Sequence, residues 1–239
     1  MKLIALQIKT TSNFQENLTH LKDLINLCEV KSLILAPELA LSGFSYDRME
    51  EAAQFSIKAI EEIKELSKDK TIALTFITKK ENKFFNTLYI FHHQQIIHTQ
   101  SKVKLFPLGN ELEYFSSGNV DNIKIIEING LKIATLICFE LRFPQLWEKI
   151  KGADIILNPA MWGLKRKDHY ESISKALALV NQCFVIACNS ADENMGKGSA
   201  IINPFGIVKK DDSKEIIEDI FDKNEIKKVR AYINIGLDI

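Results

Sequence analysis

The sequence has no excess of charge of either sign, because its 239 residues contain 31 Lys and Arg against 31 Asp and Glu. With no net field, the composition gives no reason to expect nucleic acid or an acidic membrane surface as a partner. No stretch approaches the roughly 20 consecutive apolar residues that a membrane span needs. Residues 1–9 also lack the apolar block and small-residue cleavage site of a secretory signal. We therefore expect neither nucleic-acid nor membrane partners.

Cysteine is scarce as well. The four cysteines show neither CxxC spacing nor a paired framework, and they stand at positions Cys28, Cys138, Cys183 and Cys188. This usage is typical of the reducing cytoplasm, where we expect the protein to reside. No histidines have metal-ligand spacing, and the loop over residues 9–14 has no GxGxxG motif. The sequence therefore offers no metal site and no dinucleotide-binding loop.

Strand-like and helix-like segments alternate from one end of the chain to the other. Apolar residues at helical spacing predict helices at residues 13–27, 49–67, 144–151 and 167–181. One predicted hairpin pairs residues 84–92 with 95–101, and a second pairs 123–128 with 131–137 around Asn129-Gly130. Other strands are expected at residues 3–8, 32–36, 71–78, 154–157, 183–188, 199–202 and 227–234. Residues 209–228, rich in charge, are expected to form a solvated connection or a surface helix.

The same pattern predicts the fold class. No linker, repeat or low-complexity stretch interrupts the chain, so residues 1–239 are predicted to form a single domain. Hairpins mixed with crossover helices indicate an α/β protein with mixed sheets, not a purely parallel one.

One cysteine stands where a strand gives way to a sharp turn. The apolar run 131–138 brings Cys138 to the end of a strand, and Arg142 and Pro144 follow in a turn and at a helix start. A thiol at such a junction can face a cleft, where backbone N–H groups and a helix dipole favour its thiolate form. The other three cysteines fit the commoner role of a buried apolar residue.

Two further polar side chains follow predicted strands. Glu38 lies among apolar residues, so its carboxylate should be paired or have its ionisation disfavoured by desolvation, as a general base near neutral pH requires. The alternative is a carboxylate that merely complements the dipole of a helix start. Lys102 and Lys104 share one face, and spacing alone leaves open which of them is catalytic. These residues and the thiol indicate a Glu-Lys-Cys hydrolytic site.

Three segments resemble, in the same order, the glutamate, lysine and cysteine motifs of the nitrilase superfamily of carbon–nitrogen hydrolases. They are Ala36-Pro37-Glu38-Leu-Ala-Leu-Ser-Gly43-Phe44, Lys102-Val-Lys104-Leu-Phe-Pro107 and Ile137-Cys138-Phe-Glu-Leu-Arg142-Phe-Pro144. Later matches are Asn158-Pro159-Ala-Met-Trp162 and Gly198-Ser199-Ala-Ile-Ile-Asn-Pro204-Phe-Gly206. By this match Lys102 takes the catalytic position. Glu111 matches the family's second glutamate, with Glu113 as its competitor.

The resemblance implies a four-layer α–β–β–α sandwich with two mixed central sheets, assembled as a homodimer. It also implies hydrolysis of a non-peptide C–N bond of a small-molecule amide, without a metal or a cofactor. In this scheme Cys138 is the nucleophile, Glu38 the base and Lys102 a stabiliser of the oxyanion. Glu111 would orient the base or the incoming substrate.

The segment that spans residues 162–170 is similar to the corresponding part of omega-amidase-like members. Those enzymes act on the terminal amide of small α-keto dicarboxylic acid monoamides. We expect the pocket to be lined by Phe139, Met161 and Trp162. Arg166, or Lys165 beside it, could bind a substrate carboxylate, because arginine suits bidentate pairing; the alternative is a solvated basic helix start.

Nearby polar residues are expected to have structural roles. Arg142 would hold the turn after Cys138 by pairing with Glu140 or a neighbouring acid, and His169 and Asn189 would serve in packing or behind the site.

Alternative functions remain open. Within the class, the runner-up is an N-carbamoyl amino acid or amine amidohydrolase, which releases ammonia and carbon dioxide from a ureido group. A non-catalytic interaction protein that retained the fold is a second possibility, because fold does not guarantee function. A Cys-His protease is disfavoured, because His169 falls on a predicted helix face.

Overall fold

Two mixed six-stranded sheets form the centre of the molecule in the computed structural model, which describes residues 1–237. The first sheet has the order β12-β1-β2-β3-β4-β5 and comprises β12 (Ile216–Ile220), β1 (Lys2–Leu6), β2 (Leu33–Leu35), β3 (Thr71–Lys80), β4 (Lys83–His92) and β5 (Gln95–Ser101). The second has the order β11-β10-β9-β8-β7-β6 and comprises β11 (Val208–Lys210), β10 (Ala200–Ile202), β9 (Phe184–Asn189), β8 (Ile155–Ala160), β7 (Leu131–Thr135) and β6 (Ile126–Ile128). Each has a parallel centre and antiparallel edges, so the prediction of mixed sheets is confirmed.

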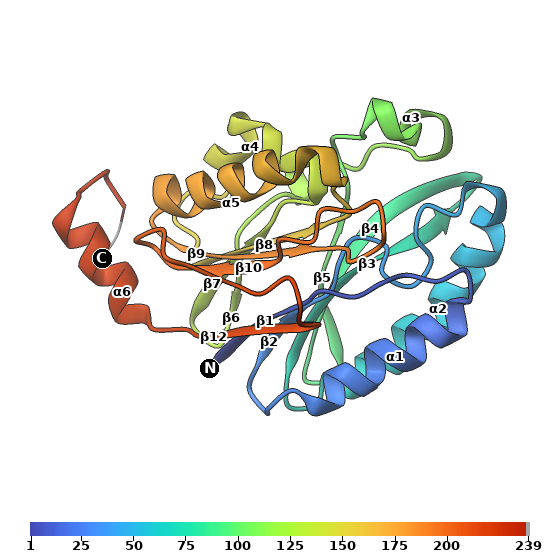
Figure 1. Cartoon of the computed structure of the whole chain (residues 1–239), viewed down its shortest axis with the longest axis horizontal. Coiled ribbons are helices and arrows are strands. Elements are labelled where there is room, and N and C mark those ends of the chain that lie inside the picture. The colour runs from blue at the N-terminus through green and yellow to red at the C-terminus, as the bar shows by residue number, and fades with distance from the viewer. Residues whose placement is uncertain (238–239) are drawn as a thin grey trace.

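Helices cover the outer face of each sheet, which gives four layers (Figure 1). Helices α1 (Phe14–Leu27) and α2 (Met49–Leu66) pack on the first sheet, and α4 (Pro144–Lys149) and α5 (Lys167–Asn181) lie over the second. The apolar spacing of α1 explains its placement, since Leu18, Leu21 and Ile25 are fully buried in one cluster with Ile4 and Leu6. The predicted α–β–β–α sandwich is therefore confirmed.

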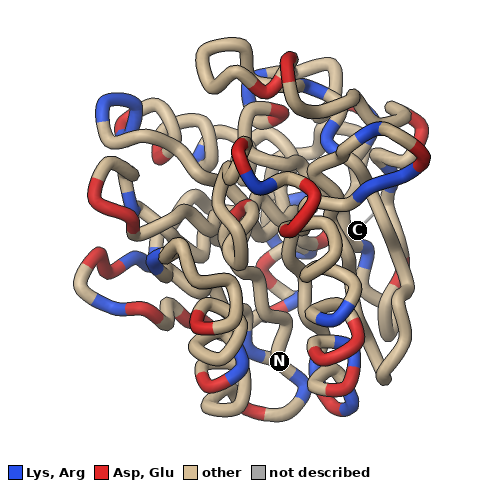
Figure 2. Tube along the Cα trace, turned by 90° about the vertical axis from the view of Figure 1, so that its right-hand side faces the viewer, with Lys and Arg blue, Asp and Glu red and all other residues tan. Residues whose placement is uncertain are grey.

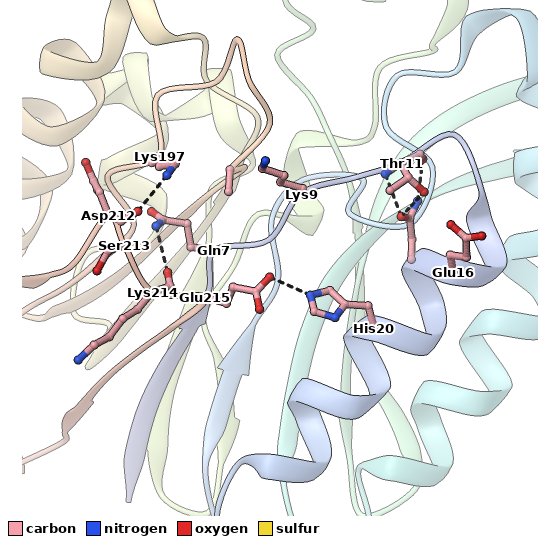
Figure 3. A pocket seen from close by; sticks show the side chains of 12 residues that line it. Gln7, Lys9, Thr11, Glu16, His20, Lys197, Asp212, Ser213, Lys214 and Glu215 are labelled. Atoms are coloured by element: carbon pink, nitrogen blue, oxygen red, sulfur yellow. Dashed lines mark hydrogen bonds and ion pairs between the residues drawn. The ribbon is translucent and has the colours of Figure 1, made fainter.

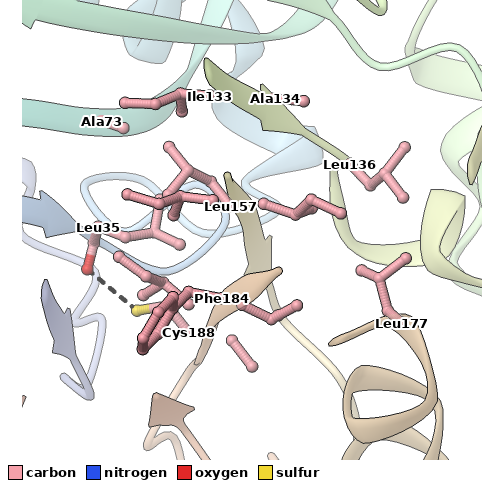
Figure 4. Close-up of a cluster of buried hydrophobic side chains, with 14 of the residues drawn as sticks. Leu35, Ala73, Ile133, Ala134, Leu136, Leu157, Leu177, Phe184 and Cys188 are labelled. Atoms are coloured by element: carbon pink, nitrogen blue, oxygen red, sulfur yellow. Dashed lines mark hydrogen bonds between the residues drawn. The ribbon is translucent and has the colours of Figure 1, made fainter. Parts of the chain in front are cut away.

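The two sheets share an apolar core. Leu35 and Ala73 of the first sheet belong to the same buried cluster as Ile133 and Leu157 of the second (Figure 4). Fully burying an aliphatic side chain of this size stabilises a fold by about 1.5–3 kcal/mol. Cys188 lies in this core and donates its thiol hydrogen to Leu35 O at 3.2 Å, so it acts as a small core residue (Figure 4).

The C-terminal region differs from the prediction. The strand expected at 227–234 is wrong, because α6 (Lys223–Tyr232) occupies that region; it begins after Asp222, whose side chain caps Asn224 N, and it buries Ile226 and Val229 at helical spacing. A strand instead lies in the charged segment, where β12 pairs with β1 antiparallel. Charged residues on the exposed positions of β12 obscured its strand pattern. The loop before Gly118 also contains a short helix, α3 (Glu111–Tyr114).

Strand direction brings the candidate residues to one edge. Because β3 pairs antiparallel with β4 and β4 antiparallel with β5, strand β5 runs in the same direction as β2. Glu38 follows β2 and Lys102 follows β5, so both lie at the carboxyl edge of the first sheet. A hydrogen bond from Glu38 N to Ala160 O, 3.3 Å long, joins this edge to the end of β8 in the second sheet.

Charge is evenly distributed over the part of the chain that the structure describes. Segments with Lys or Arg and segments with Asp or Glu are interspersed over the trace in Figure 2. Within residues 1–237, no helix has the length and apolar character to cross a membrane.

Candidate active site

A buried ammonium lies between two carboxylates at the centre of the site. Lys102 Nζ is 2.7 Å from Glu38 Oε1 and 2.6 Å from Glu111 Oε1. Lys102 and Glu38 are fully buried, and Glu111 is almost so. Burial opposes the charge of Lys102, but the acidic groups around it, Glu38 foremost, outweigh this and raise the pKa of the ammonium above its ordinary value. Lys102 is therefore a fixed cation.

The Glu38 carboxylate is held at both oxygens. Asn86 Nδ2 donates to Oε1 at 2.8 Å, beside the Lys102 bond, and Met161 N donates to Oε2 at 3.2 Å. The residues after Glu38 form turns and not a helix, so the alternative of a carboxylate at a helix start is wrong. Of the two outcomes expected for a carboxylate in this setting, pairing or disfavoured ionisation, the structure shows pairing.

Cys138 joins this group from the second sheet. It begins the 3-10 turn Cys138–Arg142 with φ 46°, a left-handed conformation that is uncommon for a residue with a Cβ. Burial raises the pKa of the thiol well above its ordinary value, and the charge of Glu38 and a hydrogen bond to it raise it further. Burial and the nearby Glu38 therefore favour the thiol over the thiolate in the resting site, in the opposite direction to the effect expected of a helix dipole.

Glu111 has an environment unlike that of its competitor. Burial raises the pKa of Glu111 to about 7, although the charge of Lys102 and its hydrogen bond lower it. Its second oxygen, Oε2, is buried and has no hydrogen-bond partner within residues 1–237. Glu113 is exposed, and Lys104 places its ammonium 5.1 Å above the Phe143 ring. The geometry therefore groups Lys102 and Glu111, and neither Lys104 nor Glu113, with Glu38.

A narrow cavity opens directly at the thiol. Its volume is about 20 Å³, close to the space that one water molecule requires. Cys138, Phe106 and Arg142 line it. So do all four residues predicted to bind substrate, which are Phe139, Met161, Trp162 and Arg166. Lys165 is exposed and does not line the cavity. Arg166 packs its guanidinium 5.1 Å from the centre of the Phe106 ring.

The expected partner of Arg142 is wrong. Its Nη2 lies 2.9 Å from His169 Nδ1, and its guanidinium stacks 4.9 Å from the Trp162 ring centre. Both carboxylate oxygens of Glu140 instead accept hydrogen bonds from backbone N–H groups, which the sequence did not reveal. Arg142 therefore lines the cavity and bonds the exposed His169.

Asn189 supports the cavity wall from behind. Trp162 N donates to its Oδ1 at 2.6 Å, and its Nδ2 donates to Trp162 O at 3.1 Å, so the amide fixes the backbone of a cavity residue.

Two site residues were missed by the analysis of the sequence. Asn86 positions Glu38, and the visible signal for it was an amide among the largely apolar and aromatic residues of the strand expected at 84–92. Glu140 is fully buried two positions after Cys138, and a carboxylate so close to a buried thiol was the visible signal.

A larger cavity lies elsewhere and contains none of these residues. It has a volume of about 310 Å³, and its lining residues already bond one another: His20 pairs with Glu215 at 2.9 Å, and Gln7 donates to Lys214 O (Figure 3). Among residues 1–237, no group of three or more His, Cys, Asp or Glu side chains is arranged to hold a metal ion.

The chain is similar to known proteins in sequence and in fold. The chain is 33% identical over 220 residues to 2-oxoglutaramate amidase of Bacillus subtilis (strain 168), which covers 87% of this chain and 84% of that protein. It is 27% identical over 197 residues to omega-amidase YafV of Escherichia coli (strain K12), with 80% and 76% covered. The solved structure of Saccharomyces cerevisiae Nit3, a member of branch 10 of the nitrilase superfamily, superposes with a TM-score of 0.85 at 21% identity, covering 99% of this chain and 95% of that one.

At that level of identity the likeness to Nit3 concerns the fold. The family is shown by the sequence itself, because the model described as carbon–nitrogen hydrolase matches residues 3–230. That match includes every residue of the candidate site, from Glu38 to Arg166. The chain belongs to the carbon–nitrogen hydrolase family.

Proposed function

We propose that the protein is an amidase that cleaves the C–N bond of a small amide through a thioester on Cys138. The observation that carries the proposal is the buried Lys102 ammonium, 2.7 Å from Glu38, in electrostatic contact with the thiol at the head of a cavity. This arrangement supports the proposal, because the Glu38 carboxylate can accept a proton and the Lys102 ammonium can stabilise an oxyanion.

Formation of the thioester is the first half of the reaction. Glu38 accepts the proton of the Cys138 thiol, which is protonated in the resting site, as the thiolate attacks the amide carbon. Lys102 and the backbone N–H of Phe139 stabilise the oxyanion, and one such donor is typically worth about 3–4 kcal/mol. The oxyanion then collapses, the C–N bond breaks, and protonated Glu38 gives its proton to the departing amine.

Hydrolysis of the thioester is the second half. Glu38 takes a proton from a water molecule, which attacks the acyl carbon, and Lys102 again stabilises the oxyanion. The C–S bond breaks, the carboxylic acid leaves, and the proton on Glu38 returns to the sulfur of Cys138. Glu111 shares the Lys102 ammonium and thereby orients it toward the reacting atoms.

The cavity supports a substrate with an anionic end. Arg166 and Arg142 bring two cations to a cavity whose lining contains no carboxylate. The buried Nε1–H of Trp162 has no hydrogen-bond partner within the described residues, so a substrate oxygen would satisfy it. We infer a small amide with a carboxylate opposite the amide, of the kind named by the 2-oxoglutaramate and omega-amidase relatives. A cavity of about 20 Å³ requires the arginine side chains to swing aside when it binds.

Ammonia release from a substrate panel tests the proposal. The panel contains small α-keto dicarboxylic acid monoamides, N-carbamoyl amino acids and uncharged amides. We expect the first group to give the highest kcat/KM, and Cys138→Ala and Glu38→Gln each to abolish turnover with a native circular dichroism spectrum. Cys28→Ala and Glu113→Gln are the matched controls. A preference for N-carbamoyl amino acids would reject the substrate, and activity retained by either site variant would reject the mechanism.

A further inference from the structure

Glu140 ties together the two loops that carry the reacting groups. Its carboxylate is fully buried, and backbone N–H groups bond both oxygens: Val103 N donates to Oε1 at 2.6 Å and Ile137 N to Oε2 at 2.7 Å. The bond to Val103 spans 37 residues of sequence and the bond to Ile137 only three. Both distances are short, as expected of charge-assisted hydrogen bonds.

The two donors are immediate neighbours of the reacting side chains. Val103 follows Lys102, whose ammonium faces the oxyanion in the proposed reaction, and Ile137 precedes Cys138. Cys138 has φ 46°, a conformation that persists only where surrounding contacts enforce it. The backbone of Glu140 also closes the turn, since Glu140 N donates to Ile137 O at 3.0 Å. One side chain therefore links the segment after β5, the segment after β7 and the turn that begins at Cys138.

We propose that Glu140 is a positioning residue that sets the placement of the Cys138 sulfur relative to the Lys102 ammonium. This rests on the proposed thioester chemistry. Glu140 itself lies outside the cavity lining, so it acts through the two backbone N–H groups and not on the substrate.

The electrostatic setting agrees with this geometry. Burial raises the pKa of Glu140 to about 7, whereas backbone hydrogen bonds from Val103, Ile137 and Lys104 and the charge of Lys102 lower it. A buried carboxylate that only filled space would be replaced by an amide at little cost. A glutamine has only one acceptor oxygen. It could accept from Val103 N or from Ile137 N, and the other N–H would face the NH₂ group of the amide, which cannot accept a hydrogen bond.

Glu140→Gln is the first test, with Glu148→Gln on the exposed face of α4 as the matched control. A misplacement near 1 Å costs about 100-fold in rate, so we expect kcat on the monoamide substrate to fall by about that factor, with KM changed less than threefold. Glu148→Gln should keep both values. Glu140→Asp keeps the charge but is too short to reach both N–H groups, so it should lose kcat as Glu140→Gln does.

Alkylation of Cys138 by iodoacetamide separates this proposal from the proposed function, because it needs no turnover. We expect both Glu140 variants to slow alkylation at least tenfold, even if no amide in the panel is hydrolysed. Wild-type alkylation and kcat in a folded Glu140→Gln would overturn the positioning role. So would full kcat in Glu140→Asp, which would show that charge alone matters. Loss of the native circular dichroism spectrum in both variants would assign Glu140 to folding and equally reject the role.

Discussion

Lys102 and Glu111 form an ion pair 2.6 Å long whose two side chains are almost completely removed from solvent. They stand nine positions apart in the sequence, and the short helix α3 turns the carboxylate back toward the end of β5. Removing one member of a buried pair leaves an uncompensated charge, which is far more costly than the loss of an exposed pair. The effects of substitutions here should therefore appear in stability as well as in activity.

Lys102→Met should abolish activity and destabilise the fold, because it leaves Glu38 and Glu111 buried without their cation. The expected loss in the free energy of unfolding is about 3–5 kcal/mol, measured by urea denaturation at pH 8. Lys104→Met, on a side chain that only lies over Phe143, is the control and should change stability by less than about 0.5 kcal/mol. Equal stability of the two variants would contradict the buried ion pairs.

Glu111→Gln should change how stability depends on pH. The pKa of Glu111 is raised from 4.5 to about 7 in the folded protein. A raised folded-state pKa contributes stability that is fully present below pH 4.5 and is lost as the pH rises through 7. Measured by urea denaturation, the free energy of unfolding of the variant should therefore increase relative to that of the wild type between pH 4.5 and 8, by up to about 3 kcal/mol.

The exposed Glu113→Gln is the control for this measurement and should follow the wild type across the whole range. A constant difference between Glu111→Gln and the wild type at every pH would show that the carboxyl of Glu111 is not the group that titrates. Activity should fall in Glu111→Gln, since the ammonium loses one of its two charged partners.

Thiol reactivity should depend on Glu38. Iodoacetamide at pH 7 should label Cys138 first, because it lines a cavity and Glu38 can accept its proton. Burial raises the pKa of Cys28 to about 11 and raises those of Cys183 and Cys188 further, so these should react slowly. General-base assistance is worth about 100-fold or more, and Glu38→Gln should slow the labelling of Cys138 accordingly. Unchanged or faster labelling would indicate a thiolate that needs no base.

Arg166→Lys should raise KM for an anionic monoamide by about tenfold, because a lysine cannot form the bidentate carboxylate pair. kcat should change little, and an uncharged amide should be hydrolysed as before. Lys165→Ala is the control, since Lys165 is exposed and lies outside the cavity. Steady-state kinetics on both substrates make the comparison. Equal effects on the charged and uncharged amides would show that Arg166 does not bind a carboxylate.

Much of this architecture followed from local patterns. The helix predicted at 167–181 has those bounds in the structure, and the hairpin predicted at Asn129-Gly130 is present because both residues adopt the positive φ that its tight turn requires. The strand β12 and helix α6 were misjudged, because a half-exposed edge strand and a surface helix both carry many charges. Their identity depends on packing against distant parts of the chain.

The site was predictable in its members and less so in its electrostatics. Position at a strand end indicated Glu38, Lys102 and Cys138, but the choice between Lys102 and Lys104 rested on the family resemblance. The protonation of the thiol depends on burial and on a carboxylate a hundred residues earlier in the chain, which no local pattern contains. The partners of Glu140 and Arg142 are equally non-local. The single-domain organisation, the homodimer and the cytoplasmic location stay predictions, and light scattering on the purified protein tests the homodimer.

The covalent intermediate provides the most direct test of the account. The protein is mixed with a slowly hydrolysed monoamide, quenched in acid during the first turnover, digested and analysed by mass spectrometry. The account predicts the mass of the acyl group on the peptide that contains Cys138, with one ammonia released per acylated chain, and no such mass in Cys138→Ala. Ammonia release at the full rate with no acyl group on Cys138 would contradict it.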